Sequence, residues 1–90
     1  MSMSVTQVAE KLQDLARAGE DPLALGKFIS SSFEWKKRGS IFVGAFHLAF
    51  NISIASLYPF SNWVGFGAGN VSDEEFKNFL EPFVDEWRNQ

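Results

Sequence analysis

Residues 39–72 read GSIFVGAFHLAFNISIASLYPFSNWVGFGAGNVS and contain no Asp, Glu, Lys or Arg. The stretch holds seven of the fourteen aromatic residues of the 90-residue chain and its single histidine, His47. Charged side chains are almost never fully buried unless they are paired, so a long charge-free run indicates a core, an interface or a membrane span. This stretch therefore decides the fold, and the flanking segments carry all of the formal charge.

The length and composition describe one folded domain. Ninety residues are too few for two hydrophobic cores. A hydrophobic content of 46% and an aromatic content of 16% exclude intrinsic disorder and supply more apolar surface than a small core can hide. Cysteine is absent, which excludes disulfides and thiolate metal sites and allows a reducing compartment. The N-terminus shows no signal-peptide pattern, so we expect a cytoplasmic protein.

Two helices are predicted before the charge-free stretch. The first, over residues 4–18, starts with Ser4 and Gln7 at the spacing of a capping box. The second starts at Asp21-Pro22, a capping side chain followed by proline at the first helical position. We expect it to end at Gly39, with three cations in its last turn, where the helix dipole favours them: Lys36, Lys37 and Arg38.

The last helix has the strongest local signals in the chain. It is predicted over residues 72–88, where Ser72 and Glu75 form a second capping box and acidic residues crowd the first turn. Apolar residues then recur every three or four positions, which is typical of an amphipathic helix. Pro82 lies inside this pattern and removes one backbone donor, so we expect a kink or a restart near Glu81.

The middle of the chain fits two templates. Residues 40–50 form a helical apolar stripe, followed by a corner at 51–53 and a short helix capped by Ser53, whereas residues 46–54 also alternate as a strand would. No Asn-Gly or Asp-Gly turn flanks this segment to make a hairpin. We therefore predict an all-α fold, a compact bundle of four to five short helices with a Gly/aromatic-rich loop at 59–70 before the last helix. An α+β fold with a short strand near 46–54 is the alternative.

A membrane span over residues 41–57 is a further alternative. The run is long enough to be considered, and the basic residues just before it would suit a cytoplasmic flank. Four polar residues within the run would need partners in lipid, however: His47, Asn51, Ser53 and Ser56. We expect a globular domain instead of a spanning protein.

The sequence lacks the residues that most enzymes use. With no Cys and a single His, a His-based triad or a two-His metal site cannot form within one chain. The glycines at 65–69 are not followed by the Lys-Ser/Thr of a phosphate-binding loop, and three clustered cations are too few for nucleic acid on a chain with a pI near 5.0. We expect no enzyme, no cofactor, no metal and no nucleic acid, and we interpret His47 as a hydrogen-bonded structural residue.

The formal charges separate by sign along the chain. Residues 70–90 hold six acidic and two basic residues, whereas residues 22–69 hold four basic residues and one acidic residue. Such a dipolar field can steer a charged partner, although charged faces also serve solubility alone.

An ordered set of motifs fills the second half of the chain, residues 46–87. They are Phe46-x3-Phe50-Asn-Ile-Ser-Ile54-x2-Leu57, Trp63-Val-Gly-Phe66, Ser72-Asp-Glu-Glu-Phe76, and Leu80-Glu-Pro82 followed by Trp87. In this order they resemble the small helical immunity proteins of bacterial toxin–immunity systems. The resemblance implies a non-enzymatic protein that binds and neutralises a cognate toxin.

A protein-binding function predicts a particular set of contact residues. Large aromatic side chains dominate many interfaces, so Trp63, Phe66 and Trp87 are the candidate anchors. Four carboxylates of the last helix would set the association rate and its salt dependence: Glu74, Glu75, Asp85 and Glu86. The alternative is a structural homodimer in which residues 41–58 pack against their copy.

Overall fold

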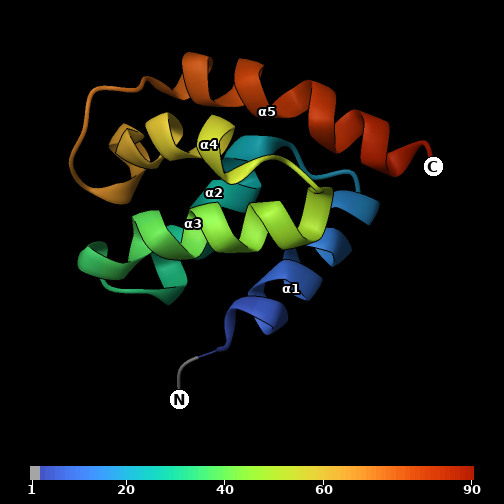
Figure 1. Ribbon diagram of the computed structural model, residues 1–90, viewed down its shortest axis with the longest axis horizontal. Helices are drawn as coiled ribbons and strands as arrows, with labels where there is room; N and C mark the ends of the chain where they lie inside the picture. The colour runs from blue at the N-terminus through green and yellow to red at the C-terminus, as the bar shows by residue number, and fades with distance from the viewer. Residues whose placement is uncertain (1–2) are drawn as a thin grey trace.

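The structure, a computed structural model, describes residues 3–90. Within these residues the fold is all-α, as the sequence predicts, and Figure 1 shows the helices in chain order. Five α-helices and two short 3-10 helices follow one another: α1 (Val5–Arg17), α2 (Pro22–Ser32), α3 (Trp35–Phe50), α4 (Ile54–Leu57), η1 (Tyr58–Asn62), η2 (Val64–Phe66) and α5 (Asp73–Arg88).

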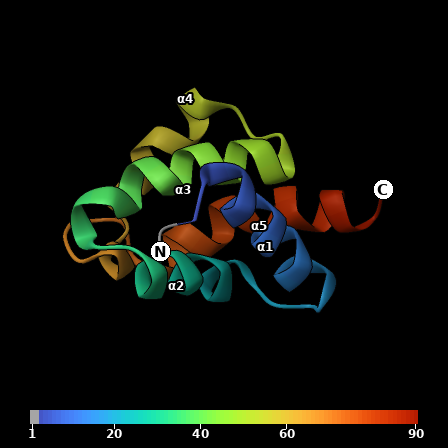
Figure 2. The ribbon, with the colours of Figure 1, turned by 90° about the horizontal axis from the view of Figure 1, so that it is seen from below.

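The helices enclose one core beneath α3. Helix α1 packs mainly on α3, whereas α2 packs on α5, α3 and η2. Helix α4 lies against the outer side of α3, away from α2, as Figure 2 shows. The α4–η1 segment is therefore the outermost layer on that side of the molecule.

Aromatic rings fill the centre of the core. Phe42 lies 4.8 Å from Phe46 and 5.3 Å from Phe76 between ring centroids, and the Trp63 ring stacks on Phe76 at 4.2 Å. Helix α2 approaches this stack closely because it presents Gly26, where a Cβ atom would lie 2.7 Å from the Trp63 ring. The charge-free stretch thus supplies most of the rings of the core, as its composition predicts.

The predicted capping motifs are present. The Ser4 hydroxyl accepts a hydrogen bond from the Gln7 amide at the start of α1, and the Ser72 hydroxyl accepts one from the Glu75 amide at the start of α5. Helix α5 runs through Pro82 to Arg88, so the predicted restart near Glu81 does not occur.

The predicted boundary between the second helix and the middle segment is wrong. Helix α2 ends at Ser32 because Phe33 adopts extended backbone angles, and α3 begins at Trp35 instead of after Ser40. Lys36, Lys37 and Arg38 consequently lie in the first turn of α3, at the positive end of a helix, and not in the last turn of α2. Arg38 holds this break in place, because its guanidinium donates to the carbonyls of Phe33 (2.8 Å) and Phe66 (3.1 Å).

Gly39 therefore does not terminate a helix. It lies inside α3, where a Cβ atom would come within 3.4 Å of the Ser61 Cβ. That distance is an ordinary van der Waals contact between α3 and η1, and Ser40 is an interior residue and not a cap.

The middle segment is helical, so the alternative strand near 46–54 is wrong. Helix α3 continues to Phe50, and Asn51 ends it in the left-handed conformation at a φ of 56°. The Ser53 hydroxyl then accepts from the Ser56 amide and starts α4, which confirms the predicted corner.

The predicted loop at 59–70 contains more structure than we expected. Two 3-10 helices occupy most of it, and Trp63 pairs with Val71 in an isolated bridge. Gly67 and Gly69 have positive φ values of 110° and 139°, a conformation that glycine adopts without strain. The chain turns back at these glycines. Trp63 lies in the core, where its indole Nε1 donates to the Asp73 carboxylate at 2.8 Å.

Candidate functional site

Two of the predicted aromatic anchors lie in the core. Trp63 is 1% exposed and Phe66 is 4% exposed, and the two rings meet edge to face at 4.9 Å between centroids. A partner cannot reach either side chain on the surface of this fold. Both residues stabilise the domain, and the glycines beside them form the chain reversal that buries them.

Trp87 lies at the surface but already has partners. Its ring is partly buried, meets Phe50 edge to face at 5.4 Å, and carries the Arg17 guanidinium 4.9 Å from its centroid. Beside it, Arg88 donates to the carbonyls of Ala16 and Glu20 and so caps the end of α1. A hollow of about 400 Å³ borders these side chains, but their contacts join α1 to α5.

The predicted carboxylates divide into two groups. The Glu75 side chain accepts from the Ser72 amide at 3.2 Å within the capping box, and Asp85 accepts from Arg88 at 3.1 Å. Glu74 and Glu86 are exposed, and neither forms an ion pair among residues 3–90. Glu74 and Glu86 are thus the carboxylates of this set that remain free to act on an approaching partner.

His47 has a structural contact. Its Nδ1 lies 2.8 Å from the carbonyl oxygen of Ile52, across the corner that joins α3 to α4. This contact agrees with the interpretation of His47 as a hydrogen-bonded residue.

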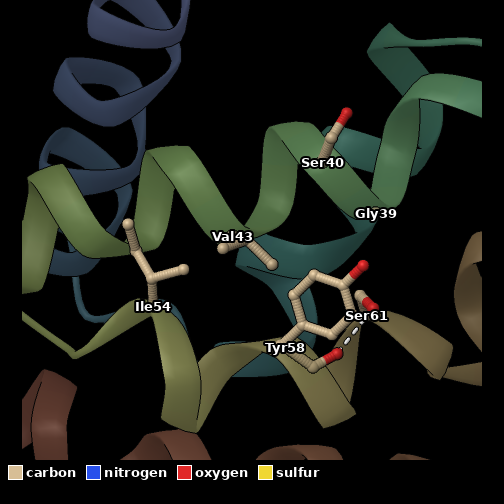
Figure 3. Close-up of a pocket in the computed structure, with 6 residues that line it drawn as sticks. All are labelled: Gly39, Ser40, Val43, Ile54, Tyr58 and Ser61. Carbon is tan, nitrogen blue, oxygen red and sulfur yellow. Dashed lines mark hydrogen bonds between the residues drawn. The ribbon is translucent and has the colours of Figure 1, made fainter.

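An apolar groove lies between α3 and the α4–η1 segment, and it is the candidate site. Its volume is about 250 Å³. Figure 3 shows the residues that line it: Gly39, Ser40 and Val43 from α3, and Ile54, Tyr58 and Ser61 from α4 and η1.

The walls of the groove are apolar and accessible. Val43 is buried beneath it, whereas Ile54 is 51% exposed and Tyr58 is 69% exposed. The Ser61 hydroxyl donates to the Tyr58 carbonyl at 2.6 Å, a hydrogen bond within the wall that α4 and η1 form (Figure 3). Every lining residue comes from the charge-free stretch, so no formal charge lies along the groove itself.

Two lysines precede the groove residues of α3 by about one helical turn. Lys36 precedes Gly39 and Ser40 by three and four residues, which places the three residues on one face of α3. Lys37 is adjacent, and the Ser40 hydroxyl donates to its carbonyl at 3.2 Å. Both lysines are exposed, and within the described part of the chain neither forms an ion pair.

The sequence analysis predicts neither this groove nor its residues as the contact surface. Only the alternative homodimer surface, residues 41–58, overlaps it, at Val43, Ile54 and Tyr58. The usable signal was the run of apolar residues on both sides of a capped corner, which places two helices side by side.

The same geometry bears on metal sites and membrane spans. Among residues 3–90, no group of three or more His, Cys, Asp or Glu side chains is placed to hold a metal ion. None of the helices in this part of the chain has both the length and the apolar character needed to cross a bilayer. Residues 41–57 are divided between two helices by the turn at Asn51.

Comparison with known proteins finds no matching family, no matching curated protein and no matching solved structure.

Proposed function

We propose that this chain is a non-enzymatic protein-binding domain that inhibits a partner toxin or enzyme by direct, stoichiometric binding. The observation that carries the proposal is the apolar groove between α3 and the α4–η1 segment. Exposed apolar side chains gathered in a hollow are typical of interaction sites, whereas isolated ones are ordinary.

The groove is suited to a protein partner for two reasons. Its walls belong to helices that already pack on the core, so little ordering is needed when a partner binds. Ile54 and Tyr58 also offer exposed area whose burial would contribute on the order of 1–3 kcal/mol each. Tyrosine is a common interface anchor because it combines a large ring with a polar end.

The free carboxylates of α5 contribute in a different way. Glu74 and Glu86 add to the negative field of a helix with six acidic residues in its segment, which would accelerate association with a basic partner. Their effect is expected on the association rate and to fall as salt rises.

The immunity-type role rests on this surface together with the resemblance of residues 46–87 to small helical immunity proteins. An inhibitor of this class needs a stable fold and a binding surface but no chemistry of its own. We place the protein in the bacterial cytoplasm, where it would meet a toxin before the toxin reaches its target.

The test is co-purification of the tagged domain from the cells that encode it. A variant with Ile54→Ser and Tyr58→Ser should lose a stoichiometric partner that the wild-type domain retains. Leu48→Ser is the matched control, because Leu48 is an equally exposed apolar residue (55%) of α3 that does not line the groove. Co-expression with the captured partner should then restore growth if the partner is toxic.

Two outcomes would contradict the proposal. A complex that survives both groove substitutions would remove the groove from the binding surface. A domain that purifies alone, as a dimer that dissociates on Tyr58→Ser, would favour the structural homodimer instead.

A further inference from the structure

We infer that the groove takes a short apolar segment of a partner protein that carries an Asp or Glu at the end beside Lys36 and Lys37. The inference rests on the proposed protein-binding function and adds the chemistry of the bound segment. It follows from the positive charges of Lys36 and Lys37, which form no ion pair in the described part of the chain and lie next to a groove with an uncharged lining.

The first step concerns the place of the two lysines. They lie in the first turn of α3, where the unpaired backbone N–H groups already give the helix a partial positive charge. Glu34 occupies the N-cap position but provides no side-chain cap. The charges of Lys36 and Lys37 therefore add to the partial positive charge at the N-terminus of α3. Together they would attract a carboxylate of a partner protein.

The second step separates these lysines from Arg38. The guanidinium of Arg38 is committed to the carbonyls of Phe33 and Phe66 and maintains the break between α2 and α3. Lys36 and Lys37 have no such role in the described part of the chain. Two cations without a structural role are thus available to a ligand.

The third step gives the bound segment a direction. Lys36 and Val43 are seven residues apart on α3, or roughly 10 Å along the helix axis. The opposite end of the groove, at Ile54, lies within residues 39–72, where the chain has no charge at all. A segment with apolar side chains in the groove and a carboxylate at one end fits in only one orientation.

The same charges disfavour two other occupants. A second copy of this groove would bring two lysines of its own and, beside them, only the Glu34 carboxylate, because the lining residues of both copies are uncharged. An anionic membrane would attract the lysines but repel a chain whose net charge is −3. A partner segment with its own acidic residue avoids both conflicts.

The experiment uses a displayed library of random 12-residue peptides, selected at low salt on the wild-type domain and counter-selected on Tyr58→Ser. We expect the recovered peptides to combine apolar residues with an Asp or Glu near one end. A variant with Lys36→Glu and Lys37→Glu should bind these peptides about fivefold or more weakly, because an attraction becomes a repulsion. Selection on this variant should instead recover Lys or Arg at the same end.

The matched control carries Lys11→Glu and Lys27→Glu. It changes the net charge by the same amount at exposed positions in the middle of α1 and α2. Peptides selected on the wild-type domain should bind it almost as tightly as they bind the wild type. Circular dichroism of each variant confirms that the helices are retained.

Several results would overturn the inference. Peptides that need Tyr58 but show no acidic preference would refute the charged end alone and leave protein binding at the groove in place. Failure to select any Tyr58-dependent peptide would refute the inference, while co-purification with the native partner would judge the proposed function separately. Lysine-dependent sedimentation with vesicles of phosphatidylcholine and phosphatidylglycerol would assign the cations to lipid headgroups.

Discussion

Reversing the charge of Lys36 and Lys37 should make the domain more stable while it weakens binding. Both lysines lie in the first turn of α3, where a cation opposes the helix dipole and an anion complements it. Had the basic triplet closed α2, as the sequence predicts, the same substitutions would destabilise the protein. The sign of the change therefore tests the helix boundary.

The magnitude can be worked from the position of the two residues. A charge near an exposed helix terminus contributes about 0.3–1 kcal/mol, so reversing two charges gains on the order of 1 kcal/mol in total. Glu34 is three residues before Lys37, and a new repulsion there offsets about 0.2–0.5 kcal/mol. We expect a net increase of about 0.5–1 kcal/mol in the free energy of unfolding.

Urea denaturation followed by circular dichroism measures this change. With a slope of about 1–1.5 kcal/mol/M for a small domain, the midpoint should rise by roughly 0.5–1 M. The increase should shrink in high salt, because exposed charges are screened. Lys11→Glu with Lys27→Glu is again the control, since both lysines lie away from helix ends. A midpoint that falls in the Lys36→Glu, Lys37→Glu variant but not in the control would refute the placement of these lysines.

Three further substitutions test other parts of the structure. Gly26→Ala should destabilise the domain by about 1–3 kcal/mol in thermal unfolding despite the higher helix propensity of alanine, because its Cβ would press on the stacked rings of Trp63 and Phe76; an unchanged melting temperature would contradict this packing. Arg88→Ala should cost about 1–3 kcal/mol and speed hydrogen exchange at the end of α1, since two backbone carbonyls lose their donor; exchange that accelerates only in α5 would argue against this cap. Tyr58→Ser should change the free energy of unfolding by no more than about 0.5 kcal/mol while it abolishes partner binding, and a large loss of stability would show that the ring is structural.

The helix ends with local signals could be predicted from the sequence. The serine caps of α1, α4 and α5 involve residues three apart in the chain, so their spacing alone identifies them. The corner at Asn51 was likewise visible, because asparagine tolerates the left-handed conformation that ends α3.

The start of α3 could not be predicted in the same way. The break after Ser32 depends on Arg38, which bonds to a carbonyl 28 residues further along the chain. Gly39 resembles a helix terminator in sequence, but it lies inside α3, next to Ser61 of η1. Both features depend on tertiary contacts that no local pattern contains.

The candidate site was predictable only as a region. Composition indicates that some aromatic residues must remain exposed, but it does not separate Trp63, which is buried, from Tyr58, which is not. Trp63 is held in the core by contacts with distant residues: its ring stacks on Phe76, its indole donates to Asp73, and it pairs with Val71. Within residues 3–90 Tyr58 has no such partners, and no local pattern contains this difference.

Hydrogen–deuterium exchange of the domain, free and in its purified complex, tests the binding surface most directly. We expect slower exchange in residues 36–43 and 54–61, the two walls of the groove, when the partner is bound. Protection confined to α5, with both walls unchanged, would show that the groove is not the binding surface.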